Sequence, residues 1–133
     1  MPKSPGKPAR PRKTAGRFRI KRIYEPAGKD DGVRVLVDRL WPRGIAKKKA
    51  HIDLWLRDLS PSDRLRRMLH ADPANWSEFV KAYGRELKQE PARTALADLR
   101  KLARSRPVTL LYAARDEAHN NAVALKRFLG RAK

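Results

Sequence analysis

Residues 33–44, VRVLVDRLWPRG, begin as an apolar run and end in charged and aromatic residues. Valine at every second position, with Arg34 and Leu36 between, predicts a β-strand that is buried on one face and partly buried on the other. The pattern stops at Asp38 and continues as Arg-Leu-Trp-Pro-Arg-Gly. Because ligands of open α/β sheets bind at the carboxyl ends of strands, this end is the first candidate for a functional site.

Three other segments have strand patterns. Residues 18–24 and 52–57 alternate in polarity, and residues 108–112, VTLLY, form the apolar run typical of a central strand covered on both faces. The turn-rich segment 25–32 joins the first two strands. Parallel crossovers usually need about a dozen residues or more, so an antiparallel hairpin of these two strands is a second interpretation.

Helices are predicted from capping residues and from apolar residues at helical spacing. The basic segment 47–49 is expected to be an exposed link. The expected helices run from Pro61 to about His70 after a Ser60 cap, with His70 capping the helix end, over residues 73–89, from Pro91 to before Pro107, and from an Asp116 cap toward the C-terminus. A strand, a short loop and a helix are half of a βαβ unit. We therefore predict an α/β fold with a small sheet of about four strands, largely parallel or mixed, and helices packed on its faces.

Composition divides the chain into two parts. The 133 residues are 41% hydrophobic and 35% charged, and the periodic part, residues 18–133, is expected to be a single domain. Prolines recur at positions 2, 5, 8 and 11, which is the three-residue period of a polyproline II helix. Residues 1–17 are therefore expected to be a disordered, basic, proline-rich arm.

The positive charge is concentrated near the N-terminus. The net charge is +19, and nine of the 33 basic residues, but no acidic residue, lie within residues 1–22. Such a segment would bind nucleic-acid phosphates by counterion release without reading sequence. A solubilising tail is the alternative interpretation.

Several classes of protein are excluded or disfavoured. The chain has no cysteine, which excludes disulfides and thiol chemistry. No apolar run approaches the ~20 residues of a membrane span, and the first residues lack the apolar centre of a secretory signal. We therefore expect a cytoplasmic protein with no membrane partner. No P-loop, GxGxxG, HExxH or Ser-His-Asp pattern occurs, so neither a metal nor a cofactor is predicted.

Two strand ends carry the candidate site residues. They follow residues 33–37 and 108–112, and they open onto one cleft if the two strands are parallel neighbours. Arginine side chains and a helix N-terminus suit a phosphate or carboxylate ligand. We predict acid–base catalysis by Asp38 and His119. The predicted ligand-binding residues are Arg39, Trp41, Arg43, Tyr112, Arg115, Asn120 and Asn121.

Several of these residues also have a structural interpretation. Asp38 can form a turn or pair with a neighbouring arginine, and Trp41 can serve in packing. His119 falls in the first turn of the expected last helix, where the dipole favours a neutral imidazole that can accept a proton. The alternative interpretation is a histidine that faces solvent and has no role in the site. Asn120 and Asn121 are poor helix formers, which indicates either function or specific hydrogen bonding.

Four motifs together resemble those of one bacterial family. They are VLVDRLWPRG at residues 35–44, DLSPS at 58–62, LRRMLH at 65–70 and TLLYAARDEAHNNA at 109–122. Over residues 19–130 the chain resembles the YeaO-like family, domain of unknown function 488 (DUF488). The resemblance implies a small cytosolic bacterial protein and assigns no catalytic residues, but the motif positions coincide with both strand ends. Longer relatives have a helix after the first strand, which favours the parallel arrangement.

Two functional hypotheses follow, from different classes. The first is a cleft that binds a small anionic ligand, phosphate-bearing or nucleotide-like, with acid–base chemistry at its residues. The alternative is a non-catalytic nucleic-acid-binding protein that uses the arm and basic helix faces, and an interaction module without a small ligand is a third hypothesis. A cleft of Arg39, Arg43 and Arg115 indicates the first, whereas a stripe through residues 47–49 and the third helix indicates a polynucleotide.

Overall fold

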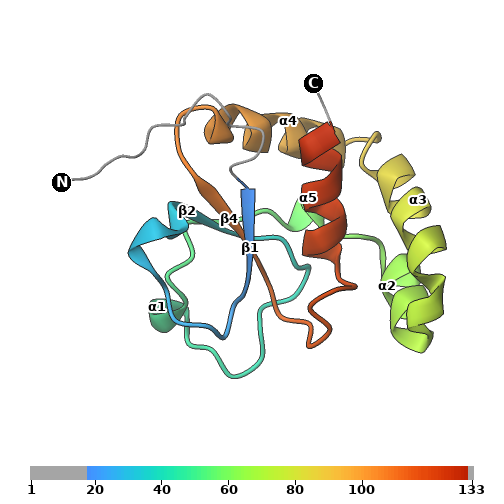
Figure 1. The fold of residues 1–133 in the computed structure, drawn as a ribbon, viewed down its shortest axis with the longest axis horizontal. Coiled ribbons are helices and arrows are strands. Elements are labelled where there is room, and N and C mark those ends of the chain that lie inside the picture. The colour runs from blue at the N-terminus through green and yellow to red at the C-terminus, as the bar shows by residue number, and fades with distance from the viewer. Residues whose placement is uncertain (1–17, 132–133) are drawn as a thin grey trace.

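Residues 18–131, which the computed structural model describes, form one four-stranded sheet with five α-helices (Figure 1). All strands are parallel, in the spatial order β1-β4-β2-β3, so the predicted α/β fold is confirmed. The strands are β1 (Phe18–Arg22), β2 (Val33–Leu36), β3 (Leu54–Trp55) and β4 (Val108–Tyr112). The α-helices are α1 (Lys47–Ala50), α2 (Asp63–Ala71), α3 (Trp76–Glu86), α4 (Ala92–Ala103) and α5 (Asn121–Arg131), and the 3-10 helices are η2 (Lys29–Asp31), η3 (Arg57–Leu59) and η4 (Pro73–Asn75).

The apolar strand β4 lies between β1 and β2. Val108 is opposite Phe18 of β1 and opposite Val33 of β2. The first two strands are therefore not neighbours, and the antiparallel hairpin interpretation is wrong. Residues 23–32 carry the chain from the carboxyl end of β1 past β4 to the start of β2 without an α-helix. The connection ends at Gly32, whose φ of 66° permits the tight entry into β2.

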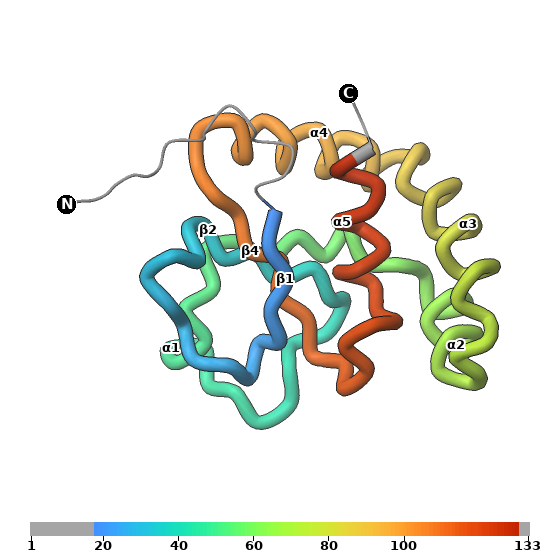
Figure 2. Tube along the Cα trace, in the orientation of Figure 1, coloured from blue at the N-terminus to red at the C-terminus, as the bar shows by residue number. Residues whose placement is uncertain are grey.

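The two faces of the sheet are covered differently (Figure 2). The valines of β2 and Leu110 of β4 face the larger apolar core, to which α2–α5 contribute. Helix α5 contacts β1 and β4, α3 contacts α5, and α2 contacts α3. On the opposite face Leu36 and Leu111 belong to a smaller cluster with Trp41, Trp55 and the end of α1.

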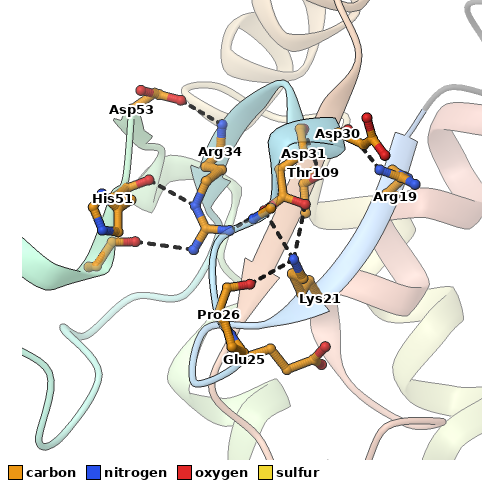
Figure 3. A network of polar contacts seen from close by, with 12 residues as sticks. Arg19, Lys21, Glu25, Pro26, Asp30, Asp31, Arg34, His51, Asp53 and Thr109 are labelled. Atoms are coloured by element: carbon orange, nitrogen blue, oxygen red, sulfur yellow. Dashed lines mark hydrogen bonds and ion pairs between the residues drawn. The ribbon is translucent and has the colours of Figure 1, made fainter.

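A buried polar network also covers this second face (Figure 3). Asp31 is at its centre: Oδ1 lies 3.0 Å from Lys21 Nζ, Oδ2 lies 2.5 Å from Arg34 Nη1, and the backbone carbonyl accepts a hydrogen bond from Thr109 Oγ1 (2.7 Å). Arg34 also donates to two carbonyls at the end of α1. Burial acts to raise the pKa of Asp31, but hydrogen bonds from the Gly28 N–H and the two cations outweigh it and hold that pKa below its usual value.

Several predicted boundaries are wrong by a few residues. Ser62, not Ser60, caps α2, and its hydroxyl accepts a hydrogen bond from the Leu65 N–H (3.3 Å). The strand expected over 52–57 has only the two residues of β3, because the chain turns into η3 immediately afterwards. The basic segment 47–49, expected as a link, forms the first turn of α1.

Candidate functional site

A cleft of about 290 Å³ opens at the carboxyl ends of β1, β2 and β4. Its lining comes from the segments that follow these three strands, from α2 and the segment before it, from α3 and from the start of α5. The strands β2 and β4 are parallel neighbours, so the two predicted strand ends meet as expected. Of the predicted site residues, the cleft is lined by Asp38, Arg39, Trp41, Arg43, His119, Asn120 and Asn121.

Asp38 joins the exit of β2 to the exit of β4 and to α5. Its Oδ2 accepts a hydrogen bond from the Ala113 N–H (2.9 Å), and its Oδ1 accepts one from the Asn121 side-chain amide (3.1 Å). Burial raises the pKa of Asp38, and the hydrogen bonds together with the charge of Arg66 oppose that shift. The carboxyl group is therefore a junction between three elements as well as part of the cleft lining.

Trp41 contributes mainly to packing. Its Nε1 donates a hydrogen bond to the Ile45 carbonyl (2.6 Å), which closes the loop after β2. Its ring lies edge to face with Trp55, with centroids 5.4 Å apart, and Lys47 Nζ lies 5.7 Å from its centroid. The residue covers the second face of the sheet and presents only part of its surface to the cleft.

Two cleft arginines from different elements approach one carboxylate. Arg39 Nη1 lies 3.4 Å from Asp63 Oδ1, and Arg66 Nη1 lies 2.8 Å from the same atom. The side chains of Arg39 and Asp63 are 48% and 50% exposed, so this pair contributes at most about 1 kcal/mol to stability. Arg43 is exposed and forms no ion pair with the residues described, while its backbone carbonyl accepts a hydrogen bond from the Tyr24 hydroxyl (2.8 Å).

His119 precedes α5 instead of lying in its first turn, because the helix begins at Asn121. The argument from the helix dipole therefore does not apply as predicted. Asp116 instead forms a turn: its Oδ1 accepts hydrogen bonds from the N–H groups of Ala118 and His119 (2.9 Å each), and its Oδ2 lies 3.1 Å from His119 Nδ1. In the tautomer that carries its proton on Nδ1, the ring donates a hydrogen bond to this carboxylate. Asp116 therefore orients the imidazole, whose ring also packs edge-on against Trp76.

The two asparagines before and at the start of α5 are held by hydrogen bonds. Asn120 is 1% exposed, and its Oδ1 accepts a hydrogen bond from the Val123 N–H (2.9 Å), which caps α5. Its Nδ2 donates to the Asp116 carbonyl (2.9 Å). Because Asn120 is the residue that caps the helix, the predicted Asp116 cap is wrong by one turn. Asn121 donates to the Val37 carbonyl (2.9 Å) in addition to Asp38. Specific hydrogen bonding therefore explains why two poor helix formers occur at these positions.

The structure does not place Tyr112 or Arg115 in the cleft lining. Tyr112 is 3% exposed and belongs to the larger core, because it shares a strand face with Leu110. Arg115 is exposed in the turn between β4 and α5. That turn is longer than expected because Asp116 caps two N–H groups there and the helix starts only at residue 121.

The lining residues that were not predicted as part of the site include Arg66, His70 and Tyr24. Arg66 and His70 lie at positions i and i+4 of α2, which places them on one helix face. Their spacing is visible in the sequence, where His70 is predicted only to cap the helix end, but the direction of that face depends on packing. Tyr24 follows β1, and it reaches the cleft because β1 is parallel to β4.

Two further properties concern only residues 18–131. No cluster of three or more histidine or carboxylate side chains is placed there to hold a metal ion. No helix in that part of the chain is long and apolar enough to cross a membrane.

The sequence comparisons give the family. Residues 17–133 match the sequence model described as the inactive DUF488-N3 subclade. The chain belongs to the DUF488 family. This DUF488 protein is 42% identical over 113 residues to the uncharacterized protein YeaO of Escherichia coli, a match that covers 84% of this chain and 96% of YeaO. It is also 42% identical over 113 residues to the uncharacterized protein Rv3073c of Mycobacterium tuberculosis, covering 85% and 93%. The predicted YeaO-like resemblance is confirmed, and no solved structure matches the chain significantly.

Proposed function

We propose that this DUF488 protein binds a small anionic ligand, phosphate-bearing or nucleotide-like, in the cleft at the carboxyl ends of the strands. The charge of the lining is the observation that carries the proposal. Among the residues described, the lining includes three arginines and two histidines but a single carboxyl group, that of Asp38. Both oxygens of that group accept hydrogen bonds, and burial raises its pKa. Guanidinium groups in excess attract anions and bind phosphate or carboxylate oxygens in pairs.

Apolar residues beside these cations support a ligand with an apolar or planar part. Leu40, which is 65% exposed between Arg39 and Arg43, lines the cleft. Leu69 and Phe79 line it as well. Small-molecule sites usually combine such apolar lining with a few polar groups that fix orientation.

Binding without turnover is the simpler form of the proposal. The two hydrogen bonds to Asp38 give this carboxyl group a structural role, and the matching family is described as inactive. Acid–base chemistry is the second form, and it is favoured by the contact that orients His119 through Asp116. Hydrolysis of p-nitrophenyl phosphate by the wild type and by His119→Ala distinguishes them. Turnover that His119→Ala abolishes supports chemistry, and absence of turnover supports binding alone.

Nucleic-acid binding is the alternative, and the net charge of +19 favours it. The arm predicted over residues 1–17 lies outside the described residues, and lysines 47–49 of α1 are exposed. Titration of the full chain with labelled duplexes of different sequence at two salt concentrations tests it. Affinity that falls steeply with salt and ignores sequence supports this alternative, and absence of binding at low salt removes it.

Thermal unfolding with added inorganic phosphate or adenosine monophosphate tests the main proposal. A ligand that binds only the folded protein raises its melting temperature. Arg43→Ala removes one of the three lining arginines, so it should reduce this rise and change the melting temperature of the free protein little. Arg115→Ala, the matched control, removes an exposed arginine that does not line the cleft and should leave the rise intact. An equal loss in both variants, or no rise in the wild type, would contradict the proposal.

A further inference from the structure

The carboxylate of Asp63 connects cleft arginines from two elements. Its Oδ1 lies 3.4 Å from Arg39 Nη1, on the segment after β2, and 2.8 Å from Arg66 Nη1, on α2. Both arginines line the cleft, but Asp63 does not. One carboxylate oxygen therefore occupies the point where two guanidinium groups of the cleft converge.

We propose that this point is the anion subsite of the cleft and that Asp63 is its internal competitor. The inference rests on the proposed function. Guanidinium groups that converge on one oxygen form an arrangement that holds phosphate or carboxylate oxygens. A phosphate group of the ligand takes the position of Asp63 Oδ1, and the Asp63 side chain turns toward solvent.

Displacement of Asp63 costs little. The side chains of Asp63 and Arg39 are about half exposed, and that of Arg66 is about one-third exposed. Exposed ion pairs of this kind are weak and exchange readily with dissolved ions. Ser62 remains as the N-cap of α2, so the helix start does not depend on Asp63.

The subsite also fixes where the rest of the ligand lies. Leu69 and His70 follow Arg66 by about one helical turn and line the same cleft. The part of the ligand attached to the phosphate therefore continues along this face of α2. The ligand is not expected to continue toward the start of α5, because the side chains of Asp38 and Asn121 there already form a hydrogen bond with each other.

Calorimetric titration with inorganic phosphate tests the subsite. The variants are Asp63→Asn and, as control, Asp98→Asn, which removes the same charge from an exposed position of α4 that does not line the cleft. Asp63→Asn should tighten phosphate binding by about two- to fivefold, and Asp98→Asn should leave it unchanged. Asp63→Ser, which also removes the charge, should behave like Asp63→Asn.

The outcomes separate this inference from the proposed function. If the wild type binds phosphate and Arg43→Ala binds it more weakly, then unchanged or weaker phosphate binding in Asp63→Asn overturns the subsite and leaves the cleft as the ligand site. An equal gain in Asp98→Asn also overturns it, because the effect is then one of net charge. Absence of phosphate binding in both the wild type and Asp63→Asn overturns both proposals.

Discussion

Asn121 donates its side-chain amide to Asp38, a residue 83 positions earlier in the chain, over 3.1 Å. The contact joins the start of α5 to the end of β2. The backbone N–H of Ala113, which follows β4, occupies the other carboxylate oxygen. Both carboxylate oxygens of Asp38 therefore face hydrogen-bond donors, so the side chain at this position must present an acceptor atom to each donor.

Replacement of Asp38 by asparagine should destabilise the protein. The new NH₂ group faces either the Ala113 N–H or the Asn121 amide, and two donors cannot satisfy each other. A loss of about 1–3 kcal/mol in the free energy of unfolding is expected, measured by urea denaturation. Asp98→Asn is the control on an exposed helix face. Equal stabilities of Asp38→Asn and the wild type would show that the carboxyl group is not held by these donors.

The stability of the protein should fall in acid because the pKa of Asp31 is lower in the folded protein than the ordinary value of 3.8 for an aspartate. Such a group contributes stability above its unfolded pKa, and the contribution disappears as the pH falls through the lower, folded pKa. Asp31→Asn also leaves the buried Arg34 without its carboxylate and should cost about 3 kcal/mol at pH 7. Urea denaturation at several pH values should show the difference between the wild type and Asp31→Asn shrinking below pH 3.8. A difference independent of pH would exclude this ion pair as its source.

Two glycines with positive φ should respond differently to alanine. A Cβ at Gly32 would lie 2.2 Å from the Pro107 carbonyl oxygen, and the strain should cost more than about 3 kcal/mol. Gly44 has a φ of 79° and open space around it, so Gly44→Ala should cost only about 1–2 kcal/mol for the backbone conformation. Thermal unfolding of both variants checks the order. A larger loss at Gly44 would contradict the close approach of residues 32 and 107.

The cap of α5 should be measurable at Asn120. Asn120→Ala removes the acceptor for the Val123 N–H and should cost about 1–2 kcal/mol. Asn120→Ser keeps a hydroxyl acceptor for this N–H and places no second acceptor against the Asp116 carbonyl, so it should be less destabilising. Circular dichroism during urea denaturation measures both. If the two variants lose the same stability, the cap is not what Asn120 contributes.

The sheet and the position of the cleft could be predicted because both follow from residue patterns within single segments of the sequence. The continuous apolar run of β4 identifies a central strand, and the break at Asp38 marks a strand end. Two such ends in a parallel sheet lie at the same edge, which brought the predicted Asp38 and Asn121 together. These features depend only on side-chain alternation and on strand direction.

The remaining parts of the site depend on tertiary contacts. Asp116 and Asn120 are both good capping residues, and only the packing of α5 decides that Asn120 is the cap while Asp116 forms a turn. The same choice moves Arg115 into an exposed turn, outside the cleft lining. Arg66 enters the lining because α2 is placed beside the strand ends, which no pattern within α2 specifies.

The central claim is that the cleft binds anions, and an NMR titration of ¹⁵N-labelled full-length protein with inorganic phosphate tests it most directly. At constant ionic strength, saturable shifts should concentrate in the amides of residues 38–43, 63–70 and 119–121, which belong to the segments that line or adjoin the cleft. The same titration of Arg43→Ala should show them only at higher phosphate concentration, and that of Arg115→Ala should show them as in the wild type. Shifts confined to α4 or to residues 1–17, or no saturable shift at all, would contradict the account.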